Sequence, residues 1–365
     1  MELNMQQFPF NEDHAMIRDV LQGWLRDWDN HGQAQHGIAK SGNAYDATLW
    51  KAFACEQGMA GISIAEEYGG AGLGMLGRTV VMEELGYVLF PSPFFSTCVI
   101  AADLINCFAT DEHKANCLNQ IAAGETIISF VDARALSAQD DLTGTVAGVL
   151  DGQNADSLLI ATTNKANVAL HYINVSASGV TISPQQTIDP LRAMAEIEFS
   201  GLALSQDTLI GTADSDIFQQ QLVISYGALG AESVGGAQRC LDMTLEYTDQ
   251  RVQFDRKISS FQAVKHRCAD MFVGLEASRS AAYYAADTQS FEEQYEASLI
   301  AKAYACEAYF KIAGDAIQMH GGIGFTWEYP LHYFFKRARA NKSLFHSVEA
   351  SYDAIATLLE KGAAS

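Results

Sequence analysis

Hydrophobic residues along this chain follow a helical spacing at first, a strand spacing in the middle and a helical spacing again to the end. Residues 10–28 repeat apolar positions every three to four residues and open with Asn11, which predicts an amphipathic helix capped by that asparagine. Residues 49–58 predict a second helix that stops at a glycine, and residues 79–89 predict a third.

The spacing changes near residue 126. Short segments rich in valine, isoleucine and threonine follow, separated by Gly, Asn, Asp and Ser, a pattern typical of strands. These segments are residues 127–131, 143–150, 157–162, 168–175, 180–182 and 195–199. They predict a mostly antiparallel β-domain between two helical regions. From residue 213 the helical pattern returns, with later helices expected at 283–288 and 297–319.

Composition narrows the function classes. A chain of 365 residues holds two or three domains. Its formal net charge of -21 argues against a nucleic-acid or anionic-membrane partner. Seven cysteines without C-x-x-C pairs argue against a disulfide framework or a zinc site, so we expect no metal. No N-terminal apolar run suggests a signal peptide or membrane span, and we expect a cytoplasmic protein.

Most of the candidate functional residues lie between residues 231 and 271. Apolar residues at helical spacing predict a long helix from Ala231, and Gly235 and Gly236 lie inside it. Because glycine lowers helix propensity, we expect a neighbouring helix or a ligand to approach the backbone there. After an irregular connection, Ser260 is placed to cap the next helix.

The irregular connection brings together side chains suited to a nucleotide. Arg251, Phe254 and Gln262 supply a guanidinium, an aromatic ring and an amide around one bend. Together such groups can bind a phosphate and an aromatic ring system.

This stretch is similar to the C-terminal domain of the acyl-CoA dehydrogenase family, in which the pattern is close to Y-x-x-x-R-x-Q-F-G-x-x-I-x-x-F-Q-x-x-x-H/F-x-x-A-D-M. The matching residues are Tyr247, Arg251, Gln253, Phe254, Ile258, Phe261, Gln262, His266, Ala269, Asp270 and Met271. The glycine of the pattern is replaced by Asp255.

Other stretches resemble the same family. E-E-Y-G-G-A-G at residues 66–72 and V-V-M-E-E-L-G-Y at 80–87 are similar to its N-terminal domain, and Q-M-H-G-G-I-G-F-T-W-E-Y-P at 318–330 to a turn near its C-terminus. Residues 127–141 depart from it, with I-I-S-F-V-D-A-R-A-L-S-A-Q-D-D in place of a T-E-x-x-A-G-S-D-like loop. The sequence therefore does not show whether this chain makes the flavin and acyl-CoA contacts of that loop.

The resemblance implies a fold of class α+β. It consists of an N-terminal helical domain (residues 1–125), a middle antiparallel β-domain (126–211) and a C-terminal four-helix bundle (212–365).

The resemblance also implies a reaction, the α,β-dehydrogenation of an acyl-CoA thioester. A carboxylate takes a proton from Cα while a hydride leaves Cβ for N5 of FAD. The residues implied to bind the FAD of a neighbouring subunit are Arg251, Phe254, Gln262, Gln318, Gly321 and Gly322. The chain would thus be a homodimer, a homotetramer or a heterotetramer with a related chain, and an electron-transfer flavoprotein is the expected electron acceptor.

The carboxylate base is the central question. The two positions at which family members usually carry it correspond to Phe345 and Ser225. We expect Glu232, within a helical turn of the paired glycines, to be the catalytic residue. The alternative is Glu349, four residues beyond the first usual position. On the sequence alone, a helix-surface role for Glu232 is equally compatible.

Two glutamate pairs also suggest catalysis. Glu66 with Glu67, and Glu83 with Glu84, could act as paired carboxylates. Solvated helix faces or helix caps are the favoured interpretation.

Two other functions remain open. One is a non-catalytic or half-site partner subunit of a heteromeric acyl-CoA dehydrogenase. Three departures favour it: the lack of a carboxylate at the two usual base positions, Asp255 in place of glycine, and the replaced loop. A flavin oxidase or monooxygenase on the same fold would need oxygen access to the flavin. Nothing in the sequence defines the acyl chain.

Overall fold

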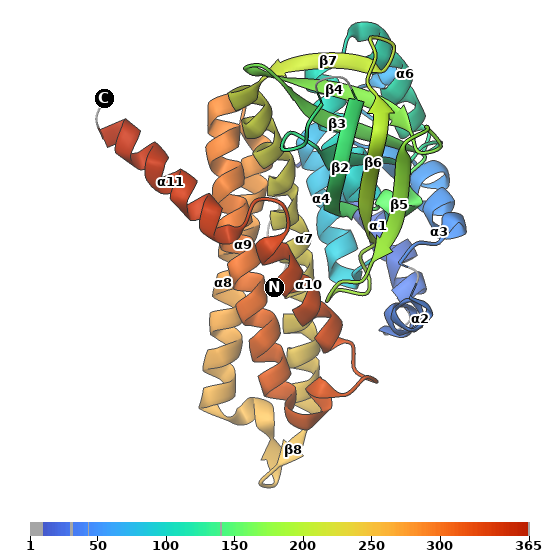
Figure 1. Cartoon of the computed structure of the whole chain (residues 1–365). Coiled ribbons are helices and arrows are strands. Elements are labelled where there is room, and N and C mark those ends of the chain that lie inside the picture. Colours follow the sequence, from blue (N-terminus) through green and yellow to red (C-terminus); the bar gives the residue numbers. More distant parts are fainter. Residues whose placement is uncertain (1–9, 30–31, 43, 139–140, 364–365) are drawn as a thin grey trace. The chain divides into compact units, whose positions relative to one another are not determined.

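Figure 1 shows the computed structural model of the chain, which describes residues 10–29, 32–42, 44–138 and 141–363. Helices come first, then strands, then helices. The first helices are α1 (Glu12–Asp29), α2 (Gln33–Ser41), α3 (Ala47–Lys51), α4 (Gly74–Val88), α5 (Ala102–Phe108) and α6 (Asp111–Ala122), with short π-helical segments at Ala52–Glu56 and Phe94–Ala101. The predicted cap of α1 is confirmed, because the side chain of Asn11 accepts a hydrogen bond from the His14 amide (3.1 Å).

Seven strands form two sheets. They are β1 (Ile128–Asp132), β2 (Asp141–Leu150), β3 (Ser157–Asn164), β4 (Asn167–Asn174), β5 (Val180–Gln185), β6 (Met194–Ala203) and β7 (Leu209–Asp214). One sheet has the order β1-β3-β4-β7, in which only β1 and β3 are parallel, and the other has the antiparallel order β2-β6-β5. Sequence patterning located the first six strands to within a few residues and missed β7.

The remaining helices are long. They are α7 (Ser215–Gln250), α8 (Gln262–Asp287), α9 (Phe291–His320), α10 (Leu331–Ser343) and α11 (Val348–Ala363), and a hairpin of β8 (Val252–Gln253) and β9 (Arg256–Lys257) joins α7 to α8. The α+β class and the order of helical, β and helical blocks are confirmed. The domain boundaries after residues 125 and 211 stay predictions.

Two details of the last block differ from the sequence-based expectation. The helix expected at 283–288 is the last turn of α8. Ser260 is not the cap of α8, because its hydroxyl donates to the Lys257 carbonyl (2.7 Å) and the residue before the helix is Phe261. The three-residue link between α8 and α9 makes these helices antiparallel neighbours, and Ser290 caps α9 by accepting from the Glu293 amide (3.2 Å).

The chain consists of two compact units, each held together by its own internal contacts. The first comprises Met1–Ser41, Met75–Phe90 and Tyr226–Ser365, and the second Gly42–Gly74 and Pro91–Ser225. No helix within the described part of the chain is long and apolar enough to cross a membrane.

The first unit is organised by close contact between α4 and α7. A Cβ added to Gly235 of α7 would overlap the Glu83 carbonyl of α4, and one added to Gly86 of α4 would overlap the Glu232 carbonyl of α7. On another side of α7, a Cβ on Gly236 would overlap the ring of Tyr309 in α9. The close approach expected at Gly235 and Gly236 is therefore made by neighbouring helices.

This packing predicts opposite effects for two Gly→Ala changes. Gly235→Ala should lower the free energy of unfolding by about 3 kcal/mol, because the methyl group must displace the backbone of α4. Gly23→Ala in α1, where a Cβ has no neighbour within 4 Å, should leave stability unchanged or raise it by up to about 1 kcal/mol through helix propensity. Urea unfolding followed by circular dichroism measures both. Equal effects would contradict the packing argument.

Candidate active site

The predicted cofactor-binding residues lie at one end of the helical bundle of the first unit. The C-terminus of α7, the β8–β9 hairpin, the N-terminus of α8 and the C-terminus of α9 meet there (Figure 1). Tyr247 of α7 stacks on His320 of α9 with ring centroids 4.4 Å apart. Arg267 of α8 forms an ion pair with Asp315 of α9 (2.7 Å). The structure thus brings the motif after α7 and the motif after α9 to one place.

His320 is fixed in a defined state at this end. Its Nδ1 bonds the Ala316 carbonyl (2.7 Å), and its Nε2 lies 3.0 Å from the Tyr329 hydroxyl. Burial lowers the pKa of His320, so the ring is neutral near pH 7. The His320 side chain therefore packs within the turn that follows α9.

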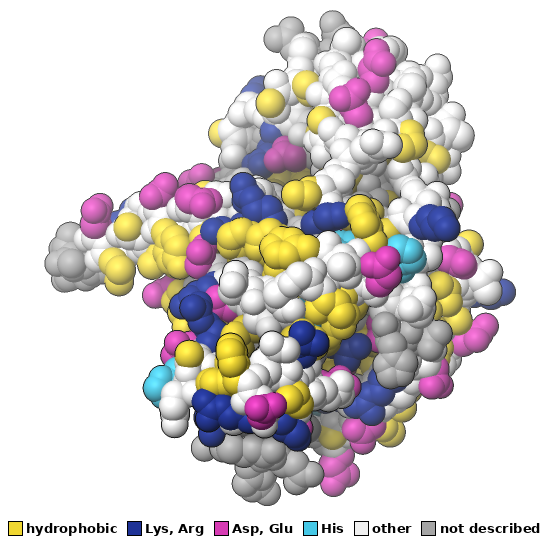
Figure 2. Space-filling model, turned by 90° about the horizontal axis from the view of Figure 1, so that it is seen from below, with side chains coloured by type: hydrophobic (Ala, Val, Ile, Leu, Met, Phe, Trp, Pro, Cys, Tyr) yellow, Lys and Arg dark blue, Asp and Glu magenta, His cyan; other side chains and the backbone are white. Residues whose placement is uncertain are grey.

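Side chains at this end face outward. Phe254 is 87 % exposed, and Phe325 and Trp327 are also largely exposed. Figure 2, a view from below, shows Lys and Arg side chains beside exposed hydrophobic ones. Within the described residues, the Arg251 side chain has no hydrogen-bond or ion-pair partner, and it is exposed like Gln262 and Gln318.

Two turns at this end contain residues with left-handed backbone conformation. Gly321 ends α9 with φ 62°, and a Cβ on Gly321 or Gly322 would have no neighbour within 4 Å. In the hairpin turn, Phe254 and Asp255 have φ of 53° and 60°. Such a turn favours glycine, asparagine or aspartate, which accounts for Asp255 where the resemblance expects glycine.

Glu232 lies inside the bundle, with 6 % of its surface exposed. Its Oε1 accepts from Arg337 Nη1 (2.8 Å) and its Oε2 from Asn341 Nδ2 (2.8 Å), both on α10. The Lys302 ammonium donates to the Asn341 carbonyl nearby. The carboxylate is therefore buried, ion-paired and oriented by two donors, and its role as a base stays a prediction.

Glu349 has a different environment. It is exposed in the first turn of α11, and hydrogen bonds from the backbone and the Ser347 hydroxyl lower its pKa. A carboxylate with a lowered pKa is a weaker proton acceptor.

The two usual base positions hold no carboxylate. Phe345 adopts φ 59° and stacks on Tyr226, with ring centroids 4.6 Å apart and planes at 10°. Ser225, in the second unit, is fully buried and donates to Asp103 of α5 (2.7 Å).

Family models match two parts of the chain. The acyl-CoA dehydrogenase N-terminal domain matches residues 11–125, and the acyl-CoA dehydrogenase C-terminal domain matches residues 216–345. The acyl-CoA dehydrogenase IpdE2 of Mycobacterium tuberculosis is 33% identical over 92% of this chain and 94% of its own length.

The chain belongs to the acyl-CoA dehydrogenase family. The expected enzyme class, acyl-CoA dehydrogenase, and the expected FAD-dependent chemistry are confirmed at the level of the family.

Solved structures of the family share the whole fold. A variant of the steroid ACAD Tcur3481-Tcur3483 superposes with a TM-score of 0.84 at 25% identity, covering 97% of this chain and 99% of that one. Butyryl-CoA dehydrogenase from Megasphaera elsdenii gives a TM-score of 0.85 at 20% identity, covering 98% of this chain and 100% of that one.

The exposed end of the bundle fits an FAD. A guanidinium without a partner among the described residues suits a diphosphate, and a protruding aromatic ring offers a surface for stacking. Open glycine backbone allows a phosphate to approach the amide groups. Among the described residues, no group of three or more His, Cys, Asp or Glu side chains could hold a metal ion.

The replaced loop of the acyl-CoA dehydrogenase middle domain begins as a strand. Residues Ile128–Asp132 form β1, beside β3. Arg134 then folds back on Asp132 through two hydrogen bonds of 2.8 and 2.6 Å. Residues 139–140 lie outside the described part of the chain.

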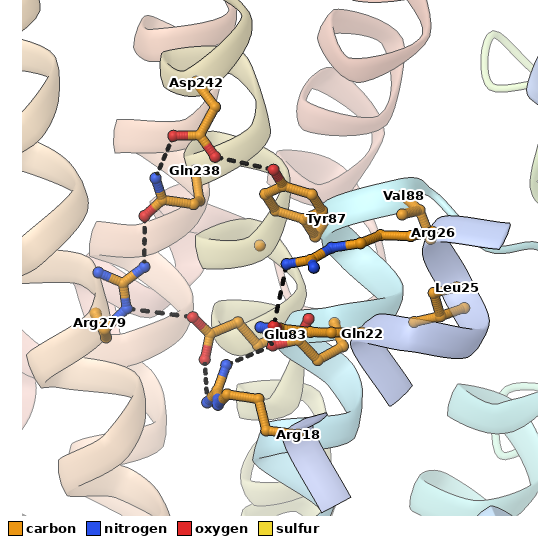
Figure 3. A pocket seen from close by; sticks show the side chains of 12 residues that line it. Arg18, Gln22, Leu25, Arg26, Glu83, Tyr87, Val88, Gln238, Asp242 and Arg279 are labelled. Atoms are coloured by element: carbon orange, nitrogen blue, oxygen red, sulfur yellow. Dashed lines mark hydrogen bonds and ion pairs between the residues drawn. The ribbon is translucent and has the colours of Figure 1, made fainter. Parts of the chain in front are cut away.

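A second group of charged residues lines a cavity of about 270 Å³ in the first unit (Figure 3). Glu83 and Glu84 of α4 are both buried there. Arg18 of α1 donates to Glu83 (2.9 Å) and to Glu84 (2.5 Å), and Arg279 of α8 donates to Glu83 (3.2 Å). The expectation of a solvated face is wrong for this pair, because helices α1 and α8 cover it. It is confirmed for Glu66 and Glu67, which are exposed.

The pKa values of the two buried glutamates are shifted in opposite directions. Burial by itself would raise the pKa of Glu83, but Arg18, Arg279 and the Tyr283 hydroxyl (2.6 Å) hold it below its ordinary value. Burial raises the pKa of Glu84, and repulsion from Glu83 adds to the rise against the opposing Arg18. The arginine and asparagine partners of Glu83, Glu84 and Glu232 come from distant parts of the chain, so no local motif signalled them. They are Arg18, Arg279, Arg337 and Asn341.

These pKa shifts predict different pH dependences for two substitutions. Glu83→Gln should cost about 3 kcal/mol at pH 7, because it leaves Arg18 and Arg279 buried without their charge partner. The depressed pKa means that the contribution of Glu83 is present above the unfolded-state value and is lost as pH falls through the folded-state value. The deficit of Glu83→Gln should therefore shrink in acid.

Glu84→Gln should cost less at pH 7. The raised pKa of Glu84 means that its contribution is present below the unfolded-state value and is lost as pH rises through the folded-state value. Urea unfolding between pH 4 and 8 tests the order. A larger loss for Glu84→Gln at pH 7 would contradict it.

Proposed function

We propose that this chain catalyses the FAD-dependent α,β-dehydrogenation of an acyl-CoA thioester and uses the exposed end of its bundle to bind the dinucleotide. The observation that carries the proposal is the convergence of two separate motifs on that end, joined by the Tyr247–His320 stack. FAD, when bound, supplies the acceptor for the hydride that leaves Cβ.

Each group at this end has a role in the proposal. Arg251 binds the pyrophosphate through its guanidinium, and Phe254 and Gln262 contact the adenosine part. Gln318 donates through its amide group, and the backbone at Gly321 and Gly322 approaches the dinucleotide closely. Because all six groups face outward, we propose that the FAD they bind belongs to a neighbouring subunit.

We propose Glu232 as the acceptor of the Cα proton. Arg337 keeps the carboxylate paired and oriented, and burial excludes water from it. Glu349 is the alternative acceptor.

Partners and location are part of the proposal. We propose a homo-oligomer or a heterotetramer with a related chain, and an electron-transfer flavoprotein as electron acceptor. The paired names of Tcur3481-Tcur3483 support the heteromeric form. A cytoplasmic location stays a prediction.

The comparisons do not favour the alternative of a non-catalytic partner subunit. The flavin content and the turnover of the chain purified alone distinguish an active dehydrogenase from such a subunit.

Arg251→Ala should weaken FAD binding about 10- to 100-fold, because one charge-assisted hydrogen-bonding group is lost. FAD fluorescence quenching during titration of the apoprotein measures the dissociation constant. Arg339→Ala, which removes an exposed arginine of α10, is the matched control and should change little. Equal dissociation constants for Arg251→Ala and the parent chain would refute this part of the site.

Glu232→Gln should abolish turnover of acyl-CoA thioesters while leaving flavin absorbance and molar mass unchanged. It should also stop exchange of the Cα protons with deuterium oxide, a readout independent of electron transfer. Glu349→Gln should keep both activities. Loss of activity in Glu349→Gln alone would move the role to Glu349, and full activity in both variants would exclude both residues.

A further inference from the structure

The cavity of the first unit shown in Figure 3 contains two charged groups outside the buried network described above. It lies between α1, α4, α7 and α8, and most of its charges belong to the ion pairs around Glu83 and Glu84. The remaining charges of the lining are Arg26 of α1 and Asp242 of α7. Among the residues that the structure describes, neither of these two has an ion-pair partner.

Asp242 is held by neutral donors. Its Oδ1 accepts a hydrogen bond from the Gln238 amide group (2.8 Å), and its Oδ2 accepts one from the Tyr87 hydroxyl (2.9 Å). The guanidinium of the neighbouring Arg239 attracts Asp242 but forms its ion pair with Asp29 (3.2 Å). A carboxylate has about four positions for hydrogen-bond donors, so roughly two of them remain for a ligand.

Arg26 is the complementary group. It is exposed to solvent, and within the described part of the chain its guanidinium makes one hydrogen bond, from Nη2 to the Gln22 side-chain oxygen (3.3 Å). Figure 3 shows its side chain extending from α1 into the cavity. A guanidinium has about five N–H donors, so most of them remain available, in the planar fork that suits a carboxylate.

Apolar surface completes the lining. Leu25 and Val88 are both buried and contribute to the walls, which therefore accept methylene groups. The cavity of about 270 Å³ equals the liquid volume of roughly nine water molecules, which leaves room for a small molecule only. The lining thus suits a short apolar chain with a charge at each end.

The charges favour a ligand of no net charge. The net charge of -21 repels a simple anion from Arg26. A simple cation would pair with Asp242 but would bring a second positive charge into the cavity beside Arg26. A molecule that carries both a carboxylate and an ammonium group avoids both costs.

We propose that this cavity binds a small amino acid, whose carboxylate pairs with Arg26 and whose ammonium group pairs with Asp242. The bound molecule links α1 to α7 next to Gly235, which lines the same cavity and packs against α4. Because only the folded unit brings the two charges together, binding stabilises the arrangement of these helices.

Isothermal titration calorimetry of the full chain with glycine, β-alanine, γ-aminobutyrate and 5-aminovalerate at constant ionic strength tests the site. At least one of them should bind with a dissociation constant at least about tenfold lower than those of butyrate and butylamine, which each carry one of the two charges. A saturating concentration should also raise the melting temperature. The titration contains no acyl-CoA, so its result does not depend on the proposed dehydrogenation. No binding of any of the four, or equal binding of butyrate or butylamine, would overturn the proposal.

Variants assign the two charges. Arg26→Ala and Asp242→Asn should each raise the dissociation constant of the best-bound amino acid at least about tenfold, and Arg26→Lys should restore part of the affinity because it restores the charge. Asp27→Asn is the matched control, since Asp27 is exposed beside Arg26 on α1 but does not line the cavity. It should leave binding unchanged. Unchanged binding in both Arg26→Ala and Asp242→Asn would place the ligand elsewhere and overturn the proposal.

A direct ion pair between Arg26 and Asp242 is the competing arrangement. Urea unfolding of Arg26→Ala, Asp242→Asn and the double variant, without ligand, forms a cycle that measures the coupling between the two groups. We expect their effects on the unfolding equilibrium to be independent. A coupling of more than about tenfold would show that the two side chains pair with each other, which contradicts a site for a zwitterion between them.

Discussion

The close approach of α4 and α7 is the contact on which the first unit depends. Gly86 faces the Glu232 backbone and Gly235 faces the Glu83 backbone, so each helix offers a glycine where the other presents a carbonyl. At this distance no side chain fits between the helices, and the polar side chains flanking the contact must point to either side. Glu83 and Glu84 therefore meet α1 and α8, whereas Glu232 meets α10.

Buried charges on the two sides of this contact are paired across helices. Three glutamates of the described residues are almost fully buried, although the chain carries a net charge of -21, and each has an arginine partner. Since a buried pair gains little over an apolar one of the same volume but loses much if one partner is removed, the pairs define which helices lie together. The same pairing explains why burial alone does not identify a base. Glu232 and Glu83 are both buried, and both are held by guanidinium groups.

The candidate cofactor end has the opposite character. Its arginine, amide and aromatic groups face solvent, and its glycines leave the backbone open. Groups of this kind gain binding energy only when a ligand covers them.

Local patterns in the sequence determined much of this protein. The change of spacing near residue 126 separated helices from strands. The R-x-Q-F and H-G-G-x-G motifs predicted the candidate cofactor end, because the residues of each motif are close together in the chain. Gly235 and Gly236 signalled a close approach without showing what approaches. Tertiary structure decided that it is α4 and α9, that Glu83 and Glu84 are buried, and that Glu232 pairs with Arg337. These contacts join residues between 65 and 196 positions apart in the chain, and no local spacing encodes them.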